Sequence, residues 1–200
     1  NRDDRTLLDF FIKLYEDIRK YPEGLGFLCS YVELLEKEAE AGFFHTRAGE
    51  IFAGRLREEL EYYLWILNSA LERFSVDAAW TAAHSKGFMA DRDHILLLLG
   101  AVKARNYDAA RQVALSYSPV DLSPLKAKTP AIERYKAGRT KIKNRLKTIA
   151  ADYFSRPDSA IPDIFRKTAE VCRGLYDFLS KYEKELGEEK LSRGICDFED

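Results

Sequence analysis

Residues 46–74 read TRAGEIFAGRLREELEYYLWILNSALERF and form the longest helical pattern in the chain. Apolar residues recur here at every third or fourth position, which places them on one side of an α-helix. They are Ile51, Leu56, Leu60, Tyr63, Leu64, Leu67 and Leu71. Thr46 is the expected N-cap, with Glu50 in the first turn. At about 1.5 Å per residue the helix would reach roughly 40 Å, a length typical of the spine of an elongated bundle.

The same periodicity continues on both sides of this helix. An apolar stripe from Leu7 to Ile18 ends at Tyr21, because Pro22 disfavours helical geometry in the residue before it. Further helices are expected at about 27–40, 76–84, 90–103, 108–117, 131–155 and 161–186. We therefore predict an all-α fold, an elongated multi-helix bundle of about seven or eight helices.

One stretch has no helical periodicity. Residues 118–130 read SPVDLSPLKAKTP, and their three prolines predict an ordered crossover or a loop. We expect residues 1–194 to form one helical unit that contains this crossover. The first residue is Asn1 and the single Met is Met89, so we expect the chain to be a piece of a longer protein.

The composition limits the functions that the chain can have. The formal net charge is −1, so any DNA contact must come from local clustering of cations. Cys29, Cys172 and Cys196 are an odd set without C-x-x-C spacing, which suggests neither a disulfide framework nor a zinc site. No apolar run approaches the length of a membrane span, and the N-terminus does not resemble a signal peptide. These features favour a reducing, cytoplasmic location.

The predicted helix from Ile132 to Tyr153 concentrates positive charge. Its apolar stripe consists of Tyr135, Ile142, Leu146, Ile149 and Tyr153. One flank carries Lys136, Arg139, Lys143 and Lys147; the other carries Arg134, Lys141 and Arg145. Between Lys126 and Lys147 the only acid is Glu133. We expect the first flank to face solvent and to match a phosphate backbone, although a solvated helix face would have the same spacing.

The DNA-contacting residues expected on this basis are Arg134, Lys136, Arg139, Lys143 and Lys147. Asp91-Arg92-Asp93-His94 could suggest a metal-dependent hydrolase, but no second His-Asp pair completes such a site. The chain also lacks the G-x-x-x-x-G-K-[ST] loop and the other common catalytic motifs. We therefore expect no catalytic residue, metal ligand or cofactor in the chain itself.

Three separated stretches resemble a known family. They are residues 14–23 (LYEDIRKYPE), Arg139-x-x-x-Lys143 followed by Leu146, and residues 193–200 (RGICDFED). Together they resemble the 1B insertion subdomain of the AddA/RexA-type large subunit of bacterial helicase–nucleases, a RecB-like branch of the UvrD/Rep superfamily 1 helicases. The last stretch is similar to the sequence at which these helicases return from the insertion into the first motor domain.

This resemblance implies a parent that is an ATP-dependent DNA helicase and exonuclease in double-strand-break repair and recombination. ATP and Mg²⁺ would bind the parent outside this chain, and residues 195–200 would begin the return into the motor domain. The parent would contact DNA and pair with a second helicase–nuclease subunit.

A competing hypothesis is a protein-docking module for a partner nuclease subunit. Trp65, Trp80 and the pair Tyr62-Tyr63 would then be its anchors, because aromatic residues dominate binding hot spots. Dependence on salt distinguishes the two hypotheses, since binding to phosphates weakens steeply with ionic strength and an aromatic interface does not.

Overall fold

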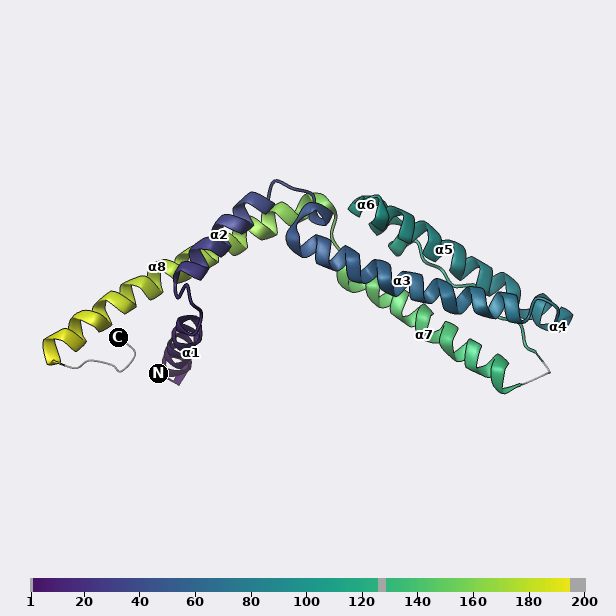
Figure 1. Ribbon diagram of the computed structural model, residues 1–200, viewed down its shortest axis with the longest axis horizontal. Helices are drawn as coiled ribbons and strands as arrows, with labels where there is room; N and C mark the ends of the chain where they lie inside the picture. Colours follow the sequence, from purple (N-terminus) through teal and green to yellow (C-terminus); the bar gives the residue numbers. More distant parts are fainter. Residues whose placement is uncertain (1, 126–128, 195–200) are drawn as a thin grey trace. The chain divides into compact units, whose positions relative to one another are not determined.

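The computed structural model of the chain describes residues 2–125 and 129–194 (Figure 1). All regular structure in these residues is helical, and the predicted all-α class is confirmed. The helices are α1 (Arg2–Arg19), α2 (Gly26–Glu38), α3 (Arg47–Arg73), α4 (Ala78–Trp80), α5 (Lys86–Lys103), α6 (Tyr107–Leu115), α7 (Pro130–Tyr153) and α8 (Ile161–Arg193). The expected return into a motor domain, residues 195–200, lies outside the described residues.

Two compact units divide the chain, within the span that the sequence suggested as one. The first unit combines residues 1–40 with residues 162–200, and the second is the continuous segment 41–161. The first and last segments of the chain therefore belong to the same unit. Each unit has its own buried apolar cluster.

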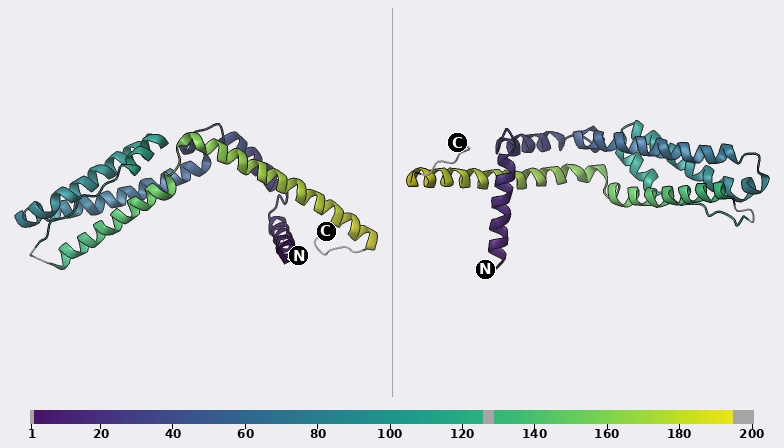
Figure 2. Two further views of the ribbon diagram at one scale, coloured as in Figure 1. Left: turned by 180° about the vertical axis from the view of Figure 1, so that it is seen from behind. Right: turned by 60° about the horizontal axis from the view of Figure 1, so that its bottom comes forward.

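The second unit is organised around α3. This helix packs along α5 and along α7, and α6 packs on α5 and α7 (Figures 1 and 2). The largest fully buried side chains of the unit are Phe44, Leu60, Leu67, Trp80, Phe88, Ile95, Leu98, Ile142, Leu146, Ile149 and Phe154. They come from all the long helices of this unit, so α3 and α7 are held by one shared core.

The beginnings of α3 and α7 follow from capping. The Thr46 hydroxyl accepts a hydrogen bond from the backbone N–H of Gly49 at 3.0 Å, as the sequence predicts. The Thr129 hydroxyl accepts one from the N–H of Ile132 at 3.2 Å, and Pro130 occupies the first turn, where its missing N–H costs nothing.

Residues 78–103 form one continuous helical run, whereas two separate helices were expected there. A π-helical turn, Thr81–Ser85, joins α4 to α5. Gly87 lies inside this run without breaking it. Its small size serves packing, because a Cβ at this position would lie 2.6 Å from Cδ2 of Leu122. The segment after α6 thus lies directly against the start of α5.

The first unit contains α1, α2 and α8. Val32 and Leu35 of α2 are buried with Ala169 of α8, and the two helices lie side by side in both figures. Tyr15 and Leu179 belong to a second cluster that joins the end of α1 to α8. Among the described residues, no helix is long and apolar enough to cross a membrane.

Candidate nucleic-acid interface

The rotational setting of α7 decides which of its cations reach solvent. Ile142, Leu146 and Ile149 are buried, as the apolar stripe predicts. Tyr135 is half-buried, and its ring meets the Phe74 ring edge-on with the centroids 5.8 Å apart. These contacts fix α7 against the core of the second unit.

Arg139 does not lie on the solvent-facing flank, and the expectation that it faces solvent is wrong, which removes the basis for its expected DNA contact. Its residue is only 3% exposed. Ile132, Arg139 and Leu146 are seven residues apart, close to two helical turns, so all three side chains point into the same core. The heptad spacing with two buried apolar residues was the signal in the sequence that this Arg belongs inside.

The buried guanidinium of Arg139 donates three hydrogen bonds. Its Nε donates to Oδ2 of Asp91 at 2.6 Å, and its Nη2 donates to the carbonyls of Val120 at 2.7 Å and Gly87 at 3.3 Å. The Tyr117 hydroxyl donates to the other oxygen of Asp91 at 2.9 Å. Arg139 therefore positions α7 by joining it to α5 and to the segment that follows α6.

Asp91 has two structural partners in this arrangement, Arg139 and Tyr117. Its residue is 1% exposed, and both carboxylate oxygens accept hydrogen bonds from Arg139 and Tyr117. Throughout residues 2–125 and 129–194 there is no group of three His, Cys, Asp or Glu residues that could hold a metal ion. Within the Asp-Arg-Asp-His stretch, Asp91 is therefore a packing residue of α5, whereas Asp93 is exposed.

Two histidines lie close to this buried network. The His94 ring lies beside the Tyr117 ring, tilted by 46° with the centroids 4.7 Å apart, and its Nε2 is buried without a hydrogen-bond partner. Burial lowers the pKa of His94, and the nearby Asp91 opposes this only in part. The His84 Nε2 lies 3.2 Å from the Ser123 carbonyl, to which it donates. Burial, with the positive charges of Lys136 and Arg139, also lowers the pKa of His84.

These two histidines predict a loss of stability in mild acid. Because folding lowers their pKa values, the unfolded chain binds protons more readily than the folded chain below about pH 6.5. The free energy of unfolding should therefore be highest above that pH and fall as the pH decreases through it. Urea unfolding at several pH values above and below this point would measure the slope. A His84→Gln/His94→Gln variant with the same slope would contradict this origin.

The other expected contact residues remain accessible. Arg134 and Lys147 are exposed, and Lys143 is partly exposed. Lys136 is partly exposed and forms an ion pair with Glu133 at 3.2 Å. Lys136, Lys143 and Lys147 share one face of α7, which we call the outer lysine row. Within the part of the chain that the structure describes, no ion pair joins Arg134, Lys143 or Lys147 to a carboxylate.

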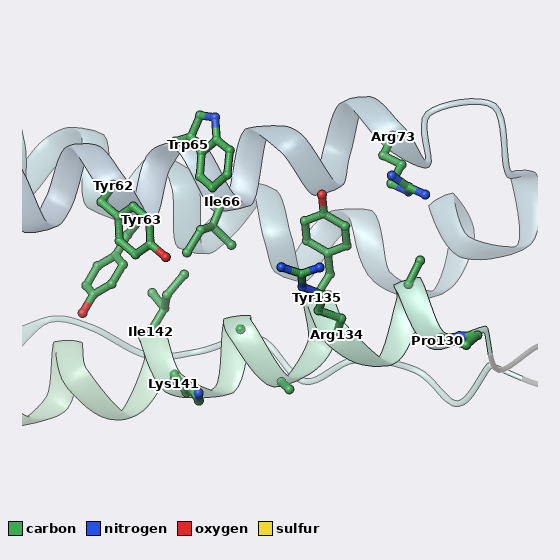
Figure 3. Close-up of a pocket in the computed structure, with 13 residues that line it drawn as sticks. Tyr62, Tyr63, Trp65, Ile66, Arg73, Pro130, Arg134, Tyr135, Lys141 and Ile142 are labelled. Carbon is green, nitrogen blue, oxygen red and sulfur yellow. The ribbon is translucent and has the colours of Figure 1, made fainter.

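An open groove of about 860 Å³ runs between α3 and α7, and we call it the α3–α7 groove. Figure 3 shows the two helices that flank it, with Tyr62, Trp65 and Ile66 on α3 and Arg134, Tyr135 and Lys141 on α7. Its lining residues are Tyr62, Tyr63, Trp65, Ile66, Arg73, Pro130, Ala131, Arg134, Tyr135, Ala137, Gly138, Lys141 and Ile142. The second unit thus has a cation-bearing hollow beside α7.

The charge of this groove has one sign. Arg73, Arg134 and Lys141 are among its lining residues, and no Asp or Glu is. Nearby, Arg145 is neutralised by Glu59, which accepts from its Nε at 2.7 Å and its Nη2 at 3.1 Å. Sequence reasoning did not assign Arg73 or Lys141 to a site. Only the packing of α3 on α7 brings Arg73 close to the cations of α7.

Two large aromatic side chains stand at the groove with little cover. Tyr62 is 57% exposed and Trp65 is 64% exposed, although both are large hydrophobic residues. Their rings are nearly parallel, with the centroids 6.1 Å apart and an interplanar angle of 19°. Trp80 differs from Trp65, because it is 1% exposed and packs between Phe74 and Phe88. Trp80 is therefore a core residue and cannot anchor a partner.

No family model, curated protein or solved structure matches this chain. The kind of ligand that α7 and the α3–α7 groove can bind is therefore inferred from their charges and aromatic rings. Cations that no carboxylate neutralises attract a polyanion, and exposed flat rings can stack on other flat rings. A nucleic acid offers both a charged backbone and flat bases.

Proposed function

We propose that this chain is a DNA-contacting accessory subdomain that binds the phosphate backbone without sequence preference. The observation that carries this proposal is the charge on α7. The helix contains seven Lys and Arg residues and two carboxylates in a chain whose formal net charge is −1. Arg139 and Arg145 are used internally, and the remaining cations are accessible to a ligand.

The resemblance of three stretches to the AddA/RexA-type subunits suggests the kind of protein in which this DNA contact is used. We propose a parent that is a bacterial ATP-dependent helicase and exonuclease of double-strand-break repair, with ATP and Mg²⁺ bound outside this chain. In that parent the subdomain would hold DNA and perform no catalysis itself. A second helicase–nuclease subunit is the proposed protein partner, and the bacterial cytoplasm is the proposed location.

The outer lysine row provides the test. In a Lys136→Ala/Lys143→Ala/Lys147→Ala variant, DNA affinity should fall for every sequence alike. The slope of log affinity against log salt should flatten by about 0.9 for each duplex phosphate that the variant no longer neutralises. Titration of a labelled duplex at several salt concentrations measures both quantities. The wild-type dissociation constant should be about 10⁻⁴–10⁻⁶ M, as for other non-specific complexes.

A matched control separates local contact from net charge. Lys167, Lys181 and Lys184 are highly exposed on α8, and changing them to Ala removes the same number of charges. This variant should bind DNA nearly as the wild type does. Equal affinities and salt slopes for the wild type and both variants would reject the proposal. The protein-docking hypothesis, which the exposed Tyr62 and Trp65 favour, would then take precedence.

A further inference from the structure

We propose that the α3–α7 groove binds single-stranded DNA, with bases stacked on Tyr62 and Trp65 and phosphates bound by Arg73, Arg134 and Lys141. This inference rests on the proposed function and narrows it, because it assigns one strand form to one site. The outer lysine row would contact backbone of any form. The groove would recognise bases that are not paired.

The aromatic pair is the first reason for a single strand. Tyr62 and Trp65 are one turn apart on α3 and present their rings nearly parallel to each other. In a duplex the faces of the bases are already stacked on their neighbours, so these rings would gain little from it. An unpaired base has a free face, and its stacking on an aromatic side chain is favourable for any of the four bases.

Charge complementarity is the second reason. Arg73 comes from the end of α3, and Arg134 and Lys141 lie two helical turns apart on α7. Among the described residues, no hydrogen bond or ion pair joins any of these three side chains to a carboxylate. An uncharged peptide would leave these cations without partners, whereas a DNA strand supplies phosphates along its length.

The dimensions of the groove agree with a short strand. Its lining residues on α7 extend from Pro130 to Ile142, which corresponds to about 18 Å of helix at about 1.5 Å per residue. A strand with the roughly 3.4 Å spacing of stacked bases would place about five nucleotides along this length. Gly138 lines the groove opposite Ile66, where a Cβ would make an ordinary van der Waals contact at 3.7 Å.

Trp65 makes the interaction directly measurable. The chain has two Trp residues, and Trp80 is buried. A change in Trp fluorescence caused by a ligand or quencher in the solvent therefore reports on Trp65. An oligothymidylate of about 15 nucleotides should quench this emission and protect Trp65 from a soluble quencher. A blunt duplex of the same length, compared when the same fraction of the protein is bound, should neither quench the emission nor protect Trp65.

Substitutions in the groove test the assignment of residues. Trp65→Ala should weaken oligothymidylate binding by about ten-fold or more and leave duplex binding within about two-fold, while Trp65→Phe should retain most of the affinity. Ala137→Glu places a carboxylate in the groove and should also weaken single-strand binding. Ala151→Glu, at an exposed position of α7 outside the groove lining, is its matched control. Circular dichroism would verify that each variant folds.

The outcomes distinguish this inference from the proposed function. If Trp65→Ala binds oligothymidylate as the wild type does, while the outer lysine row variant still loses DNA affinity, the groove assignment is overturned and the proposed function stands. The same holds if duplex quenches Trp65 as strongly as the single strand. If the wild type binds no DNA of either form at low salt, both proposals are overturned. Selective quenching together with the weaker binding of Trp65→Ala supports the groove.

Discussion

Replacing Asp91 with Ala should lower the free energy of unfolding of the second unit by about 3–5 kcal/mol. The substitution leaves the Arg139 guanidinium buried with two carbonyl partners and no counter-charge. It also removes the acceptor of the Tyr117 hydroxyl. An unpaired charge in the core costs far more than the ion pair itself contributes, so the loss should be large.

Two further variants resolve this network. Asp93→Ala is the matched control, because Asp93 is exposed and its ion-pair partner among the described residues is Arg92 on the same helix; its effect should stay within about 0.5 kcal/mol. In an Asp91→Leu/Arg139→Met/Tyr117→Phe variant every charged or hydroxyl partner is removed together, and much of the stability should return. If Asp91→Ala were as mild as Asp93→Ala, the buried pair would not hold α7 in place.

The chain contains a convenient reporter for these measurements. Trp65 and Trp80 are its only Trp residues, and both lie within residues 41–161. Their emission during denaturant unfolding therefore follows the second unit, whatever the first unit does. This matters because a protein with two units need not unfold in a single step.

Gly49→Ala should destabilise the second unit by up to about 3 kcal/mol, the upper range for overpacking. A Cβ at Gly49 would lie 1.7 Å from the carbonyl oxygen of Phe43, a backbone atom that cannot rotate away. That carbonyl also accepts hydrogen bonds from the backbone N–H and the hydroxyl of Thr46, the cap of α3. The substitution must therefore distort the start of the central helix. Chemical unfolding followed by Trp emission measures the loss.

Gly54 offers an internal comparison on the same helix. A Cβ at Gly54 would meet nothing within 4 Å, so Gly54→Ala should be neutral or stabilise by up to about 1 kcal/mol. The two substitutions are chemically identical, yet only Gly49→Ala should lower the free energy of unfolding. A stable Gly49→Ala protein would mean that the turn before α3 relaxes more easily than its hydrogen bonds indicate.

Local sequence signals were sufficient for the helices. Periodic apolar residues predicted the long helices, and Thr46 was identified as a cap because side-chain capping depends on neighbours three residues away. The junction at residues 85–89 was harder to predict. Gly87 there suggests a weak point of a helix, yet its role is to let Leu122 approach, which depends on a segment far along the chain.

The candidate site was only partly predictable for a related reason. The positive charge of α7 is visible in the sequence, but its rotation is set by the core that α3, α5 and α6 provide. Arg139 was therefore assigned to the surface, although its partner Asp91 sits on the buried stripe of α5 with Phe88 and Ile95. Arg73 was missed because its proximity to Arg134 depends entirely on tertiary packing.

The division of the chain into units has a consequence for the order of events at the ribosome. The second unit is continuous from residue 41 to residue 161, so its core can close as soon as that segment has emerged. The first unit cannot, because α2 must wait for α8, which follows the whole second unit in the chain. Val32 and Leu35 therefore stay uncovered while more than a hundred further residues are translated. A nascent chain halted before α8 should expose this apolar stripe to chaperones although its second unit is already folded.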